Sequence, residues 1–124
     1  MNDVDSAFQI PVRVLDWTAA RARALQTNLA NASVPGYRRV DVDFAALAKA
    51  VRDEQEKGKA GALAKVQPTI APDATATAGP NGNTVAFETE QVQIDKNSLL
   101  HELATFVVNG KLNTLRSAIR GSAS

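Results

Sequence analysis

The sequence predicts a mainly α-helical fold in which an N-terminal and a C-terminal helix pack as an antiparallel, coiled-coil-like pair. Apolar residues recur with helical spacing at both ends of the 124-residue chain, and the segment between them is polar and rich in Ala, Gly, Pro and Thr. Aromatic residues make up only 5%, so we expect helix-to-helix contacts rather than a thick central core. The chain therefore divides into residues 1–36, a helix and turn, residues 37–88, an extended and loop-rich middle, and residues 89–124, the second helix.

Apolar residues return every seven positions from Phe8, which predicts a first helix from about Phe8 to Asn31. It begins either at a Ser6 cap or nearer Pro11, and at 1.5 Å per residue it is about 36 Å long. The members of its apolar stripe that we expect in the helix pair are Leu15, Leu25 and Leu29, with the small Ala22 allowing close approach. Trp17 lies off this stripe, so we expect it to be exposed and to contact another subunit.

The segment after the first helix predicts a type II turn. Proline fixes φ at Pro35, and Gly36 supplies the positive φ that the next position requires. Alternation then predicts an extended segment whose inward residues are Val40, Val42 and Phe44. A short helix is expected over Phe44–Arg52.

Residues from Glu54 to Asn83 contain no aromatic side chain and three prolines, and they are rich in Lys, Ala, Thr and Gly. We expect a mobile or partner-ordered loop there, with short strands near Ala64–Ile70 and Thr84–Phe87.

The second helix is predicted from Thr89 to Gly121, with acidic residues in its first turn and basic residues toward its end, as the helix dipole favours. Its apolar stripe changes face near Phe106, where apolar side chains nearly surround the helix, so several neighbours are needed to bury them. We predict that the two helices form a seam for pairing and assembly, made by Leu15, Ala22, Leu25, Leu29, Leu99, Leu103, Phe106, Leu112, Leu115 and Ile119.

Composition excludes several classes of function. The net charge of +1 gives no basic surface of the kind that nucleic acid requires, and the chain has no cysteine. No apolar run approaches the roughly 20 residues of a membrane span, and the start lacks the features of a cleaved secretory signal. We therefore expect a protein that leaves the cytoplasm, if it does, without a cleaved leader.

Polar side chains give no catalytic, cofactor or metal site. Asp41 and Asp43 are expected on the solvent face of the extended segment, and His101 is a lone histidine on a helix surface. No nucleophile–base–orienter set is present, so we do not expect an enzyme or a small-molecule substrate. Arginines are interpreted as surface and inter-subunit pairing groups: Arg13, Arg21, Arg23, Arg38 and Arg39.

The stretch LANASVPGYRRVDVDF resembles the N-terminal motif of the flagellar rod and hook family, Ala-Asn-x-x-Thr-Pro-Gly-Tyr. Val34 stands where threonine is usual, and the matching residues are Ala30, Asn31, Pro35, Gly36 and Tyr37. The stretch VVNGKLNTLRSAIRG, residues 107–121, is similar to the end of the proximal rod member of that family. The resemblance covers about half of the chain.

The resemblance implies a structural subunit of the proximal rod of the bacterial flagellar basal body, exported by the flagellar type III apparatus without a cleaved signal. It implies as partners other copies of the chain, the rod protein FlgC, the rod–ring adaptor FliE, the membrane ring and the export gate. The residues leave one alternative open, a small helical adaptor or chaperone-like module of a secretion system, which would keep a folded core when its ends are trimmed.

Overall fold

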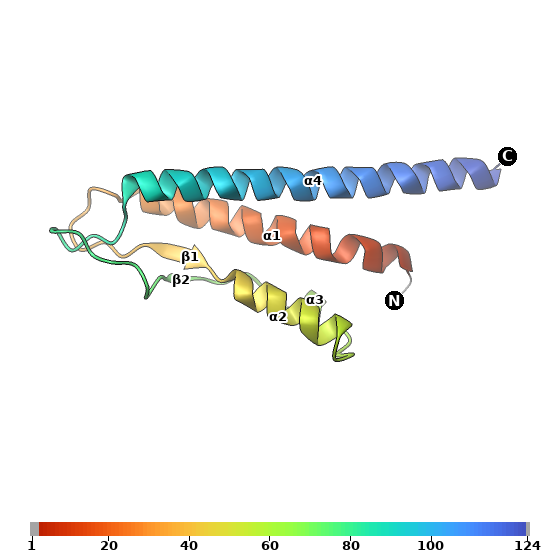
Figure 1. The fold of residues 1–124 in the computed structure, drawn as a ribbon, viewed down its shortest axis with the longest axis horizontal. Coiled ribbons are helices and arrows are strands. Elements are labelled where there is room, and N and C mark those ends of the chain that lie inside the picture. Colours follow the sequence, from red (N-terminus) through yellow and green to blue (C-terminus); the bar gives the residue numbers. More distant parts are fainter. Residues whose placement is uncertain (1–2, 124) are drawn as a thin grey trace.

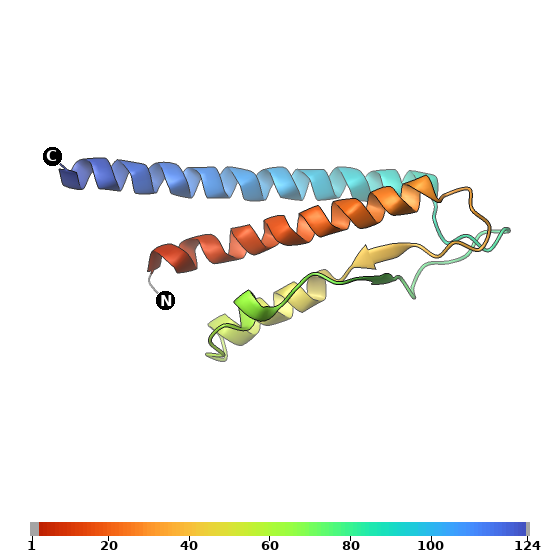
Figure 2. The same cartoon turned by 180° about the vertical axis from the view of Figure 1, so that it is seen from behind.

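In a computed structural model, which describes residues 3–123 and the side chains of residues 8–122, the chain forms three layers (Figures 1 and 2). The middle layer is α1 (Asp3–Ala30), and α4 (Phe87–Ala123) lies along one side of it. The other side carries β1 (Val40–Val42), α2 (Phe44–Gln55), α3 (Ala62–Lys65) and β2 (Ile70–Pro72). The predicted fold, two packed terminal helices around a loop-rich middle with short β structure, is confirmed.

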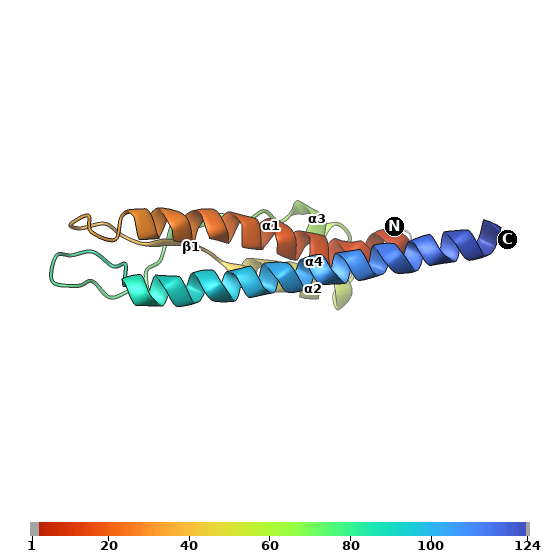
Figure 3. The same ribbon diagram turned by 90° about the horizontal axis from the view of Figure 1, so that it is seen from above.

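The two long helices run antiparallel. Asn28 of α1 donates to Glu90 of α4 at 3.2 Å, and Asn97 of α4 donates to the Thr18 carbonyl at 2.9 Å, so residue numbers rise along one helix as they fall along the other. By this pairing the start of α1 lies opposite roughly residue 114. The last turns of α4 therefore extend past α1, as Figures 1 and 3 show.

The first helix is longer than predicted. It begins at Asp3, upstream of both expected starts, and Pro11 lies inside it. Proline removes one backbone donor from a helix interior, which is unfavourable on local grounds. Ile10 and Val14 on either side of Pro11 pack against the core, and this tertiary contact keeps the segment helical.

The middle of the chain differs from the predicted loop. β2 pairs antiparallel with β1, with Val42 opposite Ile70 and Val40 opposite Pro72. The strand expected near Ala64–Ile70 begins only at Ile70, because Ala64 and Lys65 belong to the helical turn α3, whose Leu63 is buried in the core. The strand expected over Thr84–Phe87 is wrong, since Phe87 already opens α4.

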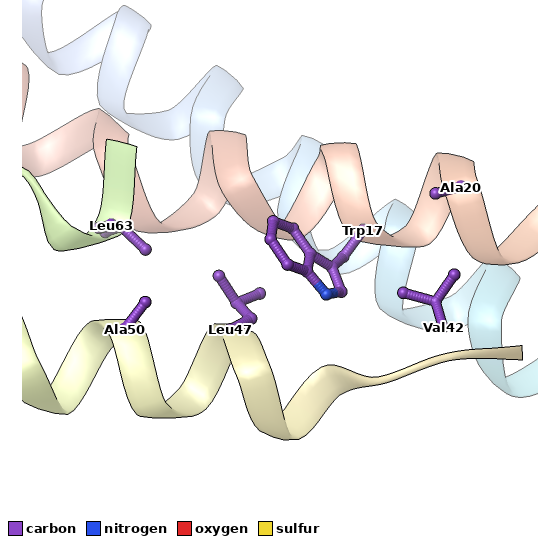
Figure 4. Packing of buried hydrophobic residues seen from close by; sticks show 6 residues of the cluster. All are labelled: Trp17, Ala20, Val42, Leu47, Ala50 and Leu63. Carbon is purple, nitrogen blue, oxygen red and sulfur yellow. The ribbon is translucent and has the colours of Figure 1, made fainter. Parts of the chain in front are cut away.

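The hydrophobic core lies between α1 and the layer of α2, α3 and β1, and Trp17 is its largest member (Figure 4). Its side chain is fully buried among Val42, Leu47 and Leu63, and its indole N–H donates to the Asp43 carbonyl at 3.2 Å. The expectation that Trp17 is exposed and contacts another subunit is therefore wrong. It lies off the stripe that faces α4 because α1 has neighbours on two sides.

We expect Trp17→Ala to lower the free energy of unfolding by about 3–5 kcal/mol, because it empties the centre of this core. Val12→Ala on the same helix is the control. Val12 is 41% exposed, so its truncation should cost less than about 0.5 kcal/mol. Urea unfolding of the purified proteins measures both, and equal stability of the two variants would contradict the assignment of Trp17 to the core.

Candidate assembly surfaces

The predicted turn after α1 is present. The Tyr37 N–H donates to the Val34 carbonyl at 3.2 Å, and Gly36 has a φ of 74°, as the third position of a type II turn requires. Asn31 closes the helix, its side chain donating to the Thr27 carbonyl at 2.8 Å. Tyr37 points back to α1, where its hydroxyl donates to Asn28 at 3.3 Å.

A second loop, residues 81–84, supports this turn. The Asn83 side-chain amide lies 2.9 Å from the Asn31 carbonyl and 2.6 Å from the Val34 carbonyl, and Asn83 is buried. The Gly36 N–H donates to the Asn81 carbonyl at 2.9 Å. Sequence reasoning missed Asn83. The turn-forming residues around Asn83 predict a turn at that place. A local sequence pattern does not show which distant segment the turn contacts.

Arg39 joins the layers through ion pairs. Its guanidinium contacts Glu90 of α4 at 2.6 Å, Asp73 after β2 at 2.5 Å, and Asp41 of β1 at 3.2 Å. Arg21 of α1 also pairs with Asp41, at 2.9 Å. These two arginines therefore pair within the chain, and their assignment to inter-subunit pairing is wrong. Asp41 is half-buried rather than solvated, because its carboxylate pairs with Arg21 of α1 and with Arg39.

The ion pairs hold these groups in their charged forms. Burial lowers the pKa of Arg39, but its bonds to Glu90 and Asp73 outweigh burial, and the pKa is raised. Burial raises the pKa of Asp41, yet bonds from Arg21 and the Val42 backbone leave it below its usual value. Asp73 also has a lowered pKa, through the Thr75 hydroxyl and backbone and Arg39.

The predicted seam divides between two faces. On α1, Leu25 is fully buried, and its other members, Leu15, Ala22 and Leu29, are half-buried. On α4, the side toward α1 instead consists of residues spaced three, four or seven apart that are buried or half-buried: Glu90, Ile94, Asn97, Ala104, Val108 and Leu115. Of the predicted seam residues of α4, Leu115 is thus the one that is half-buried on the side toward α1.

The other members of the predicted α4 seam do not pack on α1. Leu99 is 68% exposed, Leu103 57% and Phe106 75%, and Leu112 and Ile119 are exposed as well. The pairing expected for these side chains within the chain is therefore wrong. The helix carries two stripes rather than one, and the small and polar residues of the α1 side gave the weaker sequence signal. Within residues 3–123, α1 is the only helix or strand that packs against α4.

The sequence singles out Asp43 and His101 as well, and both make contacts within the chain. His101 is exposed, and its Nδ1 lies 2.6 Å from the Thr18 hydroxyl across the helix pair. Among residues 3–123, no three His, Cys, Asp or Glu side chains gather as a metal site would need. None of the described helices has the combined length and apolar character needed to cross a membrane. Two exposed features offer contact surfaces to a neighbour: the turn, where Val34 is 45% exposed, and the exposed stripe of α4.

Comparison with known proteins points to one family. The chain is 30% identical to the flagellar basal body rod protein FlgB of Aeromonas hydrophila, over 94% of this chain and 95% of that one. It is 32% identical to FlgB of Cereibacter sphaeroides over 82% of this chain and 84% of that one. It is 26% identical to FlgB of Salmonella typhimurium over 98% of each chain. No protein-family model matches the chain.

Acid should weaken the fold. Besides Asp41 and Asp73, Asp53 has a pKa lowered to about 2 by its bonds to Lys49 and Lys57. A carboxylate whose pKa is lower when folded stabilises the fold above the unfolded pKa of about 3.9, and this contribution disappears as the pH falls through the folded value. We expect the urea midpoint to fall between pH 4 and pH 2, and to fall less for Asp53→Asn. Equal losses in both proteins would contradict this role of Asp53.

The turn should depend on glycine at position 36. Gly36→Val is expected to destabilise the protein by about 1–2 kcal/mol, because the side chain meets no neighbour but the positive φ is strained. Gly110 lies in the interior of α4, where an added Cβ also meets nothing within 4 Å. Gly110→Ala should therefore stabilise the protein by up to about 1 kcal/mol. Unfolding in dilute solution compares the two, and a neutral Gly36→Val would contradict the turn assignment.

Proposed function

The chain belongs to the family of the flagellar basal body rod protein FlgB, and on this basis we propose that it polymerises as a structural subunit of the proximal rod. In this proposal its terminal helices make the contacts between subunits. The rod so formed links the membrane ring and the export gate to the rest of the flagellar drive shaft. The role is mechanical, and it requires no cofactor.

The exposed stripe of α4 is the observation that carries the proposal. Leu99, Leu103 and Phe106 are each more than half exposed, although each would contribute about 1.5–3 kcal/mol if fully buried. A contiguous apolar patch that is exposed to solvent is typical of a site that another protein covers. A rod subunit needs such a face, because each copy must contact several others.

The turn motif has a second role in this proposal. Ala30, Asn31, Pro35, Gly36 and Tyr37 set the direction in which the chain leaves α1 and so the position of the β1–α2 layer relative to the helix pair. Asn83 and the Arg39–Glu90 pair support that orientation from the other side. The turn therefore fixes how the outer layer of each subunit is presented to its neighbours.

The partners we propose are other copies of the chain, the rod protein FlgC, the rod–ring adaptor FliE, the membrane ring and the export gate. The subunit reaches the basal body through the flagellar export apparatus and needs no cleaved signal. These assignments rest on the family and on the two terminal helices that every contact would use.

Motility of a deletion strain carrying variants of the gene tests the proposal. We expect Leu103→Lys to abolish swimming and to leave basal bodies with rings but no rod in electron micrographs, because it places a charge within the apolar stripe. Ser98→Lys is the matched control, since Ser98 is exposed on α4 outside the stripe.

Swimming by the Leu103→Lys strain would overturn the role of the stripe. Complete rods and hooks in the strain without the gene would overturn the rod assignment itself. Circular dichroism of both purified variants separates loss of assembly from loss of folding.

A further inference from the structure

We propose that the free protein forms a two-fold dimer in which the exposed stripe of α4 packs antiparallel against the same stripe of a second copy. The inference rests on the surface of α4 and is independent of the rod function proposed above. Three features of this helix support it: the spacing of the stripe, the charges beside it, and one glycine.

Six of the exposed residues of α4, four of them apolar, follow the spacing of a coiled-coil seam. Their separations alternate between four and three, as the seam positions of a two-stranded coiled coil do. The positions are Val92, Lys96, Leu99, Leu103, Phe106 and Gly110, and all are exposed. The seam is about 27 Å long, since it spans 18 residues at 1.5 Å each. One helix lying along it would cover all of its apolar side chains.

The charges beside the seam select an antiparallel partner. One side of the seam is formed by the residues directly before Lys96, Leu103 and Gly110, and we call this side the charged flank. It consists of Asp95, Glu102 and Asn109, and it continues at the same interval of seven with Arg116. In an antiparallel pair this flank faces the same flank of the other helix. The acidic end of one helix then lies beside the basic end of the other, so opposite charges meet at both ends.

A parallel pair lacks this complementarity. There the charged flank faces the opposite flank of its partner, which carries Gln93, Leu100, Val107 and Thr114 and has no charge. Because opposite charges meet at both ends when two copies pair, a second copy of the chain is the partner that this surface fits. An unrelated apolar helix would bury the stripe but would leave the charged flank unpaired.

One register satisfies both the seam and the flank. It places Leu103 opposite Phe106 of the second copy, Leu99 opposite Gly110, and Asp95 opposite Arg116, each pair occurring twice by symmetry. The small residue thus faces one of the large ones. Nothing within this chain requires glycine there, because an added Cβ meets no atom within 4 Å, and glycine costs a helix interior about 1 kcal/mol. The dimer explains the glycine at position 110, because its missing side chain leaves room for Leu99 of the second copy.

Sedimentation equilibrium of the purified full chain tests the dimer. We expect the wild-type mass to rise from one copy to two with concentration, and Phe106→Asp to remain at one copy throughout. Ser98→Asp, outside the seam on the same helix, should dimerise like the wild type. A wild-type chain that stays monomeric, or that forms larger assemblies without stopping at two, would overturn the proposal.

A charge exchange tests the direction of pairing. Arg116→Glu should weaken dimerisation about tenfold, because it replaces two attractive pairs by two repulsive ones. Adding Asp95→Arg should restore it. The two positions are about 32 Å apart along one helix, so a rescue cannot arise within one chain. If the double variant dimerises no better than Arg116→Glu alone, the antiparallel register is wrong.

Cysteine pairing gives an independent measure of the same register, because the chain has no native cysteine. A mixture of the Glu102→Cys and Asn109→Cys proteins should form a disulfide-linked heterodimer under mild oxidation. A mixture of Asp95→Cys and Glu102→Cys should not, since these positions lie about 18 Å apart along the antiparallel pair. Equal cross-linking in both mixtures would overturn the register.

Discussion

The ion pair between Arg39 and Glu90 is the interaction on which the arrangement of the layers depends. Arg39 lies between the turn and β1. Glu90 lies in the first turns of α4, and its side chain is only 1% exposed. Glu90 also accepts a hydrogen bond from Asn28 of α1, so all three layers meet at one carboxylate. Removing either partner of a buried pair leaves an uncompensated charge, which typically costs 3–5 kcal/mol. The pair therefore links the direction of the turn to the position of α4.

Polar contacts also fix how the two long helices align. Thr18, Asn28, Glu90 and Asn97 are buried between them, where an apolar seam alone would tolerate sliding by a turn. Hydrogen bonds at defined positions favour one register over its neighbours, as buried polar residues do in coiled coils. The helix pair is thus specified by directional contacts, while the apolar core lies on the other side of α1.

Local physics predicted the helices and the turn, because helical periodicity and the positive φ at Gly36 are properties of short segments. It did not predict the environment of Trp17, because whether a residue off one stripe is exposed depends on whether a second layer covers it. Nor did it predict which side of α4 faces α1. Leu99, Leu103 and Phe106 are the most conspicuous apolar residues of that helix, whereas the α1 side uses Asn97 and Ala104. Asn83 acts through a contact between loops that are distant in sequence, which no local pattern encodes.

The extension of α4 beyond α1 couples folding to association. Isolated helical turns are marginal in water, and most helices gain their stability from a packed face. The turns after Leu115 have no such support from α1, and they carry Ile119 with Arg116 and Arg120, all exposed. A neighbour that covers this end supplies the missing face, so the free energy of ordering the last turns becomes part of the free energy of binding. Affinity at that end then varies with the number of turns left uncovered, and shortening the helix by one turn alters association without touching the folded body.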